Sequence, residues 1–424
     1  MMTYEETVKW LEMPDKRYPK ADLPAFSVLM KKLGDPQEKL RFVHVTGSNG
    51  KGSICIMLAE ILRLSGYRTG LYTSPHLSVY NERCRADGED IPDADLVRLA
   101  ERVKAAAEET QLSLGLFYKM TALSLLYFAE RSCDIVVLEV GRGGRRDCTN
   151  LVTTTELAVI GSVSLEHTEV LGDSLFAIAR EKSGIMKKGA AALMLRQSEE
   201  AMSAAAETAE ALGVPLSFTD PSQLSVERFS AAGQTLTYRA RKHLRLSCPG
   251  LYQTENVQVV LDAADILKAR GFRIPEKAVR TALSSLKWPG RFEQLGSHPA
   301  VLIDGAHNIG AVKALAEGLN AYYPGRKYIF IVTLLWDRPW QKMLEILMPF
   351  AASFIAVETS DPKALHAKEL AKWLEMNSDA RVLTAENEAD ALRLALSEAG
   401  RNGRICVCGS IYLAGAVRDL YLKK

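Results

Sequence analysis

The sequence predicts an α/β protein with doubly wound parallel sheets, and three observations support this fold class. Short β-type runs alternate with longer stretches of helical spacing along the 424 residues. Residues 134–140 (DIVVLEV) are almost continuously apolar, as expected for a strand buried on both faces of a parallel sheet. A Gly-rich segment, residues 47–53, separates a predicted strand from a predicted helix. Alternation of this kind indicates βαβ units.

The predicted elements follow one another in the order that βαβ units require. In the first part of the chain, strands are predicted at 41–45, 68–73, 134–140 and 157–163, and helices at 52–64, 94–111 and 120–131. Residues 215–249 differ, because short alternating runs between turn residues predict a small antiparallel insertion before a helix at 254–270. The βαβ rhythm then restarts, with strands predicted at 300–304, 327–333, 353–357, 380–383 and 404–408.

A segment rich in Gly and Pro, residues 287–299, separates the two βαβ regions. We place the domain boundary near Gly296, which gives one domain of residues 1–295 and a second of residues 296–424. The second domain has the ordinary size of one α/β unit. The same linker is the candidate hinge between the domains.

The overall composition excludes several classes of protein. A net charge of +2 argues against a dedicated nucleic-acid or membrane-surface binder, which usually carries a clear basic excess. No apolar run approaches the roughly 20 residues that span a bilayer, and the first residues do not resemble a signal peptide. Seven cysteines without a redox or zinc spacing are expected to be reduced thiols. We therefore expect a cytoplasmic protein.

The strongest local motif is the loop Gly47-Ser48-Asn49-Gly50-Lys51-Gly52-Ser53. Its glycines let backbone N–H groups face phosphate oxygens, and the following helix N-terminus favours negative charge. Lys51 has the reach to contact β- and γ-phosphates, and the hydroxyl of Ser53 suits Mg²⁺. The spacing departs from the usual phosphate loop, because Thr46 replaces the first Gly and Gly52 separates Lys51 from Ser53. The alternative is a Gly-rich turn beside a surface lysine.

Polar side chains also follow other predicted strands. Glu139 ends the apolar run 134–140, Ser74 follows the strand at 68–73, and His167 follows the strand at 157–163. The carboxyl ends of parallel strands form the crevice where α/β proteins bind ligands, and Mg²⁺ prefers hard oxygen donors. The alternatives are a salt bridge from Glu139 to a nearby arginine, and a structural role for His167.

Eight motifs in order resemble the folylpolyglutamate synthase family, which includes bifunctional dihydrofolate synthases and belongs to the Mur ligase superfamily. They are TGSNGKGS, LYTSPHLSVYNERCRADG, LEVGRGGRRDCTN, EHTEVLG, AREKSGIMK, PGRFE, DGAHN and GSIYLAG, and they run from Thr46 to Gly415. The resemblance implies an N-terminal phosphate-loop ATPase domain of the Mur ligase type with a small β insertion. It also implies a smaller, Rossmann-like C-terminal α/β domain.

The same resemblance implies an activity. An ATP-dependent amide ligase would join L-glutamate to folate, to dihydropteroate or to both, through an acyl phosphate, and would release ADP and phosphate. Two Mg²⁺ ions are implied as cofactors. The partners would be small molecules only, without nucleic acid or membrane, and the self-contained two-domain plan suggests a monomer.

The resemblance also assigns roles to individual residues. Catalytic roles fall on Lys51, His167 and Lys182, of which Lys182 is carbamylated in the family. The implied metal ligands are Ser53, Ser74, Glu139, His167 and Lys182. Nucleotide contacts are implied for Gly47, Asn49, Gly50, Lys51, Gly52, Ser53, Asn256, Arg291, Asp304 and His307. Asp147 matches a pterin-binding position, and Arg83 would bind the substrate. His76 would belong to the folate pocket, with a structural role as the alternative.

Several positions depart from the family pattern. Glu166 stands where Asp usually precedes the histidine, and Ile309 replaces a proline after DGAHN. Arg142 and Arg146 replace apolar residues, and Tyr118 replaces a common glutamate. The added arginines suit an acidic polyglutamate tail or are solvated surface charges. Two other readings stay open: a Mur-type ligase with a non-folate carboxylate acceptor, and a regulatory or motor-type NTPase.

Overall fold

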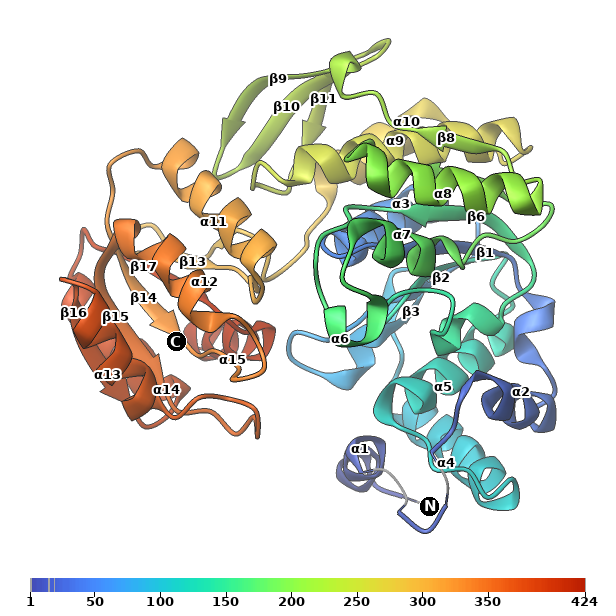
Figure 1. Cartoon of the computed structure of the whole chain (residues 1–424), viewed down its shortest axis with the longest axis horizontal. Helices are drawn as coiled ribbons and strands as arrows, with labels where there is room; N and C mark the ends of the chain where they lie inside the picture. The colour runs from blue at the N-terminus through green and yellow to red at the C-terminus, as the bar shows by residue number, and fades with distance from the viewer. Residues whose placement is uncertain (1, 14–15, 19, 424) are drawn as a thin grey trace. The chain divides into compact units, whose positions relative to one another are not determined.

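The computed structural model describes residues 2–13, 16–18 and 20–423, and the chain divides into two compact units (Figure 1). The first unit comprises Met1–Ser225, Tyr238–Ala240 and Thr254–Ser285. The second comprises Val226–Thr237, Arg241–Gln253 and Leu286–Lys424. Within the described residues, no helix is long and apolar enough to cross a bilayer.

An eight-stranded sheet forms the centre of the first unit, with the strand order β4-β3-β2-β5-β1-β6-β7-β8. Along the part of this order that runs β2-β5-β1-β6-β7-β8, all neighbouring strands pair in parallel. This confirms the parallel sheet predicted for the centre of the unit. The β3–β4 edge is antiparallel, because Asp87 and Gly88 adopt left-handed backbone and reverse the chain between them. The strands are β1 (Phe42–Thr46), β2 (Thr69–Tyr72), β3 (Cys84–Ala86), β4 (Glu89–Asp90), β5 (Ile135–Glu139), β6 (Thr155–Ile160), β7 (Ala191–Met194) and β8 (Leu216–Phe218).

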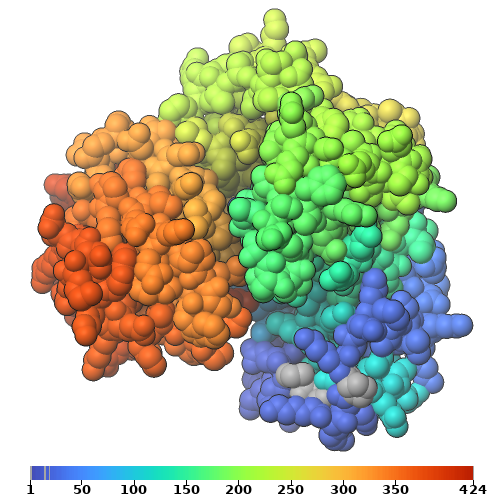
Figure 2. Space-filling view, viewed as in Figure 1, coloured from blue at the N-terminus to red at the C-terminus, as the bar shows by residue number. Residues whose placement is uncertain are grey.

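Helices cover both faces of this sheet, and every residue of β5 is therefore buried. One face packs against α3 and its neighbour α10, and the other face packs against α5, α7 and α8. Helices α7 and α8 form the green surface visible in Figure 2. The helices of this unit are α1 (Tyr4–Glu12), α2 (Leu23–Lys32), α3 (Lys51–Leu64), α4 (Asp93–Glu109), α5 (Leu116–Glu130), α6 (Thr168–Leu171), α7 (Leu175–Ser183), α8 (Glu199–Leu212), α9 (Gln253–Ala269) and α10 (Glu276–Ser285).

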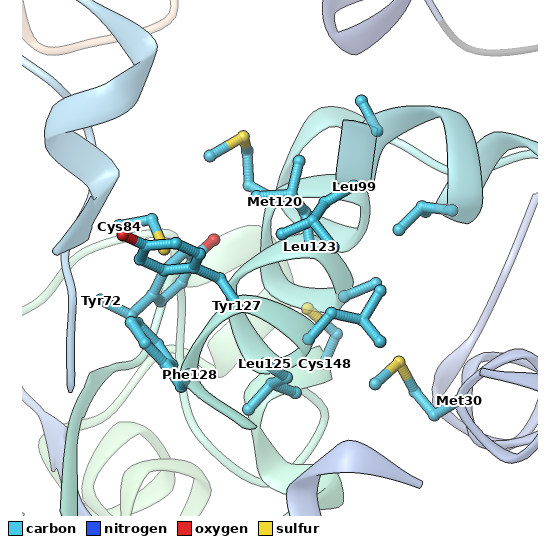
Figure 3. Packing of buried hydrophobic residues seen from close by; sticks show 14 of the residues in the cluster. Met30, Tyr72, Cys84, Leu99, Met120, Leu123, Leu125, Tyr127, Phe128 and Cys148 are labelled. Carbon is cyan, nitrogen blue, oxygen red and sulfur yellow. The ribbon is translucent and has the colours of Figure 1, made fainter. Parts of the chain in front are cut away.

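A large apolar cluster of the first unit surrounds α5 (Figure 3). Met120, Leu123 and Phe128 of this helix pack among Tyr72 and Cys84 from the sheet and other apolar side chains. The sequence predicted this helix to begin at residue 120, whereas it begins at Leu116, directly after Gly115 in extended backbone. The extra turn carries Phe117 and Tyr118, which pack against this cluster.

A six-stranded sheet forms the second unit, with the order β12-β13-β17-β14-β15-β16. All neighbours pair in parallel except β12, which runs antiparallel to β13 at the edge. Phe330 and Phe354 stack at 5.5 Å within its core. The strands are β12 (Glu293–Gln294), β13 (Ala300–Ile303), β14 (Tyr328–Val332), β15 (Ala351–Val357), β16 (Arg381–Ala385) and β17 (Arg404–Cys408). The helices are α11 (Ile309–Tyr322), α12 (Trp340–Leu347), α13 (Ala367–Asn377), α14 (Glu388–Ala399) and α15 (Ile411–Leu422).

The predicted antiparallel insertion forms a separate three-stranded sheet, β11-β10-β9. Its strands are β9 (Leu224–Ser230), β10 (Gly233–Tyr238) and β11 (Arg241–Leu246). Most of these residues group with the second unit, a grouping that the sequence pattern did not indicate. The reason is local packing: the ring of Phe229 lies 5.0 Å from that of Tyr322, whose hydroxyl accepts a hydrogen bond from the Gly250 N–H.

Candidate active site

The Gly-rich loop joins the end of β1 to the start of α3, as the motif predicts. Gly47 and Gly50 both have positive φ values, +157° and +81°, which turn the backbone tightly between Thr46 and Lys51. The Lys51 ammonium donates hydrogen bonds to the carbonyl oxygens of Gly47 and Ser48, at 2.9 and 3.3 Å. A lysine folded over a loop at a helix N-terminus gives an anion-binding arrangement.

The loop is supported by residues from two other parts of the first unit. Ser162, after β6, accepts a hydrogen bond from the Ser48 N–H through its carbonyl oxygen at 2.6 Å and exchanges hydrogen bonds with Asn49. Asn256, in α9, is buried against the loop, and a Cβ at Gly50 would overlap its side-chain oxygen. The structure thus brings Asn256 to the loop across about two hundred residues of sequence.

Two predicted metal ligands meet at the carboxyl edge of the sheet. Glu139, at the end of β5, is 3% exposed, and its Oε2 accepts a hydrogen bond from the Ser74 N–H at 2.9 Å. Ser53 is buried in the first turn of α3. Hydroxyl and carboxylate oxygens are the donors that Mg²⁺ prefers, so these residues fit that ion chemically.

Lys182, at the end of α7, is buried and not an exposed helix lysine. It is 1% exposed, and its Nζ lies 3.0 Å from Glu166 Oε1. Burial lowers the pKa of Lys182 to about 8, although Glu166 opposes that shift. Burial acts to raise the pKa of Glu166, but the charges of Lys182 and Lys51 together lower it. The two groups therefore form an ion pair at neutral pH.

His167 follows Glu166 in the sequence and contacts Glu169. It precedes α6 with left-handed backbone, φ +48°, and its Nδ1 lies 3.6 Å from the exposed Glu169 carboxylate. Within the residues that the structure describes, no group of three or more His, Cys, Asp and Glu side chains is arranged to hold a metal. The predicted metal ligands include two serines and a lysine, so they do not form a group of that kind.

Asp147 is held rigidly beside the arginine-rich loop. Its Oδ1 accepts hydrogen bonds from the N–H and hydroxyl of Thr149, at 3.0 and 2.6 Å, and its Oδ2 accepts one from the Arg142 N–H at 3.0 Å. Burial raises the pKa of Asp147 against these hydrogen bonds. The hydroxyl of Thr149 in turn contacts the buried His44, whose Nε2 lies 2.9 Å away.

The side chains around Asp147 explain one departure from the family pattern. Tyr118, where the family has glutamate, packs edge-on against Phe26 at 5.0 Å. The Tyr118 ring thus extends an apolar contact where a carboxylate would need a polar partner. The nearby Arg142, Arg145 and Arg146 are exposed.

His76 and Arg83, which the sequence assigns to substrate binding, form a direct contact. Arg83 is 4% exposed, and its Nε donates to His76 Nδ1 at 2.9 Å. Burial, and secondarily the charge of Arg83, lower the pKa of His76 to about 3. The imidazole is therefore neutral at physiological pH.

Three predicted nucleotide contacts come together at the end of β13 in the second unit. Asp304 is buried, and its carboxylate accepts hydrogen bonds from the Tyr252 hydroxyl and the Phe292 N–H, at 3.0 and 2.9 Å. Burial raises the pKa of Asp304, opposed by the charge of Arg291. Arg291 lies so close to Gly305 that a Cβ there would overlap it, and His307 Nδ1 lies 2.8 Å from the Gly305 carbonyl oxygen.

Sequence reasoning missed the residues that hold these acids in place. Thr149, two residues after Asp147, forms a local turn that a DxT pattern indicates. Tyr252 belongs to the same YQTEN segment as Asn256, so the motif itself contained that signal. No local signal links His44 to Thr149, which lies 105 positions away.

Comparison with known families and proteins agrees with this geometry. Residues 45–264 match the Mur ligase middle domain, and residues 290–411 match the Mur ligase glutamate ligase domain. A dihydrofolate synthase/folylpolyglutamate synthase of Bacillus subtilis is 31% identical over 98% of both chains. The folylpolyglutamate synthase of Lacticaseibacillus casei is 31% identical over 99% of both chains.

Solved structures give the same result. Folylpolyglutamate synthase of Mycobacterium tuberculosis in complex with ADP is 30% identical, covers 99% of this chain and 98% of its own, and superposes with a TM-score of 0.88. Escherichia coli FolC in complex with DHPP and ADP is 27% identical, with coverage of 100% and 98% and a TM-score of 0.86. The chain therefore belongs to the folylpolyglutamate synthase/dihydrofolate synthase family of Mur ligases.

Proposed function

We propose that this protein is an ATP-dependent ligase that adds L-glutamate to folate, to dihydropteroate or to both. The observation that carries the proposal is the joint position of the phosphate loop and the Ser74–Glu139 pair at the carboxyl edge of one sheet. This edge is where α/β proteins bind their ligands. The names of the relatives and the complexes of two solved relatives with ADP support it.

The chemistry follows from the need to activate a carboxylate. The acceptor carboxylate attacks the γ-phosphorus of ATP, the bond to the bridging oxygen breaks, and ADP leaves with that electron pair. The amine of L-glutamate then attacks the acyl phosphate, expels phosphate and forms the amide. The phosphate loop and Lys51 would position the triphosphate and offset its charge, which is the main protein contribution to phosphoryl transfer.

We propose that two Mg²⁺ ions bind at Ser53, Ser74, Glu139, His167 and Lys182. When bound, they would neutralise the charge that collects where the phosphates meet a carboxylate. Lys182 would enter this set after carbamylation, which replaces its positive charge with an oxygen donor. The nearly complete burial of Lys182 favours the neutral amine that this modification requires.

Nucleotide contacts from both functional domains complete the proposal. Gly47, Asn49, Gly50, Gly52 and Asn256 would act from the first unit, and Arg291 would act from the second. Asp304 and His307 would act from residues 296–424. We propose that the enzyme works as a cytoplasmic monomer and uses no nucleic acid or membrane partner.

Asp147, His76 and Arg83 would bind the acceptor, and the acceptor is the part of the proposal that most needs a test. Purified protein should release phosphate from ATP only when L-glutamate and a suitable acceptor are both present. A panel of dihydropteroate, tetrahydrofolate and its diglutamate separates the synthase activity from chain extension. Phosphate release without acceptor would favour an NTPase, and no ligation to any pterin would favour a Mur-type ligase with another carboxylate acceptor.

A further inference from the structure

Three lysine or arginine side chains are buried among the residues that the structure describes: Arg83, Lys119 and Lys182, which are 4%, 2% and 1% exposed. Two of them have compensating partners. Lys182 is paired with Glu166 at 3.0 Å. Lys119 donates to the backbone carbonyl oxygens of Trp10, Leu11 and Met13 at the end of α1, where helix carbonyls favour a cation.

Arg83 differs from the other two. Within the described part of the chain, its guanidinium makes one hydrogen bond, from Nε to His76 Nδ1 at 2.9 Å, and no ion pair. The ring of Tyr80 lies 5.6 Å from the guanidinium carbon and 4.3 Å from the ring of His76. These two rings orient the guanidinium but leave its charge uncompensated.

A buried charge without a counter-charge is costly, so proteins rarely keep one without a reason. The guanidinium has five N–H donors in a planar fork, and the single bond to His76 uses one of them. The two terminal nitrogens of such a fork match the two oxygens of a carboxylate. The chemistry of this position therefore favours a carboxylate ligand.

The position of Arg83 ties it to the reactants. Its carbonyl oxygen accepts a hydrogen bond from the Thr73 N–H at 3.0 Å, and the next residue, Ser74, donates to Glu139. The backbone of Arg83 is thus bonded to Thr73, the residue next to the predicted metal ligand Ser74. A carboxylate bound there belongs to one of the reacting molecules.

We propose that the Arg83 fork binds an α-carboxylate of a reactant and that His76 is a positioning residue which holds the fork. This inference rests on the proposed function. Two reactants carry such a group: the incoming L-glutamate, and the terminal glutamyl residue of a folate acceptor. Dihydropteroate carries one carboxylate, which is the one activated, so it has none to spare for Arg83.

Steady-state kinetics of Arg83→Gln and Arg83→Lys test the proposal. Removal of the fork should raise the KM of the bound reactant at least tenfold, the loss expected for a charge-assisted pair, with the KM of ATP unchanged. Arg83→Lys, which keeps the charge without the fork, should recover part of that loss. Arg98→Gln, at an exposed ion pair with Glu130, is the matched control and should change neither constant.

The affected reactant identifies the source of the carboxylate. A raised KM of L-glutamate with every acceptor indicates the incoming amino acid. A raised KM of tetrahydrofolate, with dihydropteroate unchanged, indicates the acceptor. Unchanged KM values for all three in a folded variant would overturn the proposal.

Substrate analogues keep the test independent of folding defects and of the proposed function. Isoglutamine, in which a carboxamide replaces the α-carboxylate, tests the first source in the wild-type protein, and a folate analogue with the same replacement tests the second. In the wild type, one or both of these analogues should bind at least tenfold more weakly than the parent compound. In Arg83→Gln, each analogue should bind as tightly as its parent compound. Equal binding of both analogues and their parents to the wild type contradicts the inference. Absence of any glutamate ligation by the wild type contradicts the proposed function instead.

Discussion

The ammonium of Lys182 lies 3.0 Å from the carboxylate of Glu166, and the two side chains are 1% and 14% exposed. Glu166 is one of the positions predicted to depart from the family pattern, and its carboxylate makes this contact. An ion pair buried to this degree is coupled to folding, because loss of either partner leaves an uncompensated charge.

With Lys182 unmodified, Glu166→Gln should lower the free energy of unfolding by about 3 kcal/mol, because the Lys182 ammonium remains buried without an anion. Urea denaturation at pH 7 measures the change. Addition of Lys182→Met to the same variant should recover most of the loss. A double variant as unstable as Glu166→Gln alone would show that the pair is not the cause.

Lys182→Ala should reduce ligase activity strongly, because it removes the proposed oxygen donor along with the buried amine. Acetate or another short carboxylate should restore part of the activity, since it supplies the missing oxygens. Wild-type protein assayed with the same carboxylate is the control and should show no gain. Lack of rescue at any concentration would speak against a carbamylated Lys182.

Lys51→Ala should abolish turnover, because it removes a positive charge held over the loop that would bind the phosphates. The loop conformation does not depend on this side chain alone, since Ser162 supports Ser48 and Asn49. The variant should therefore melt within a few degrees of the wild type. Near-normal phosphate release would contradict the phosphate-loop assignment.

Gly50→Ala tests the contact between the loop and Asn256. The new methyl group would overlap the Asn256 side-chain oxygen, in addition to the strain of a positive φ of +81°. If displacement of the Asn256 side chain costs about 1.4 kcal/mol or more, nucleotide affinity should fall at least tenfold. Calorimetry with ADP measures this change.

Gly66→Ala is a matched control, because Gly66 has φ +94° but nothing within 4 Å of a Cβ. This control substitution should cost about 1 kcal/mol of stability and leave nucleotide affinity unchanged. Equal effects of the two changes on affinity would rule out the Asn256 contact.

Sequence reasoning could propose a candidate site because strand ends are local features. Glu139 and Ser74 follow apolar runs, and parallel pairing of β2 with β5 then brings them to one edge. The partners of the buried groups could not be predicted in this way. Periodicity reports which residues face the core, but it does not report that Lys182 meets Glu166 or that Arg83 meets His76. Those distances depend on how loops pack after the sheet has formed.

The same limit applies to the antiparallel insertion. Its strands were predicted from alternation, but the tilted ring contact between Phe229 and Tyr322, both in the second unit, joins residues almost a hundred positions apart. A local sequence pattern does not indicate which distant residue an aromatic side chain of this sheet will contact.

His44 gives the stability a pH dependence. It is fully buried, and among the described residues its Nδ1 has no hydrogen-bond partner. The Thr149 hydroxyl donates to Asp147, so it accepts the proton of His44 Nε2. Burial, with a smaller effect of Lys187, lowers the pKa of His44 to about 3 in the folded protein.

Between about pH 6.5 and pH 3 the unfolded chain binds a proton at His44 that the folded protein does not bind. Stability from this group is therefore present above about pH 6.5 and is lost as the pH falls below that value. From pH 7 to pH 5 the wild type should lose about 2 kcal/mol through His44 alone. His44→Gln has no titrating group there, so its unfolding free energy, measured in urea at both pH values, should fall by about 2 kcal/mol less. Parallel pH profiles for the two proteins would show that His44 is protonated as easily in the folded state as in the unfolded chain.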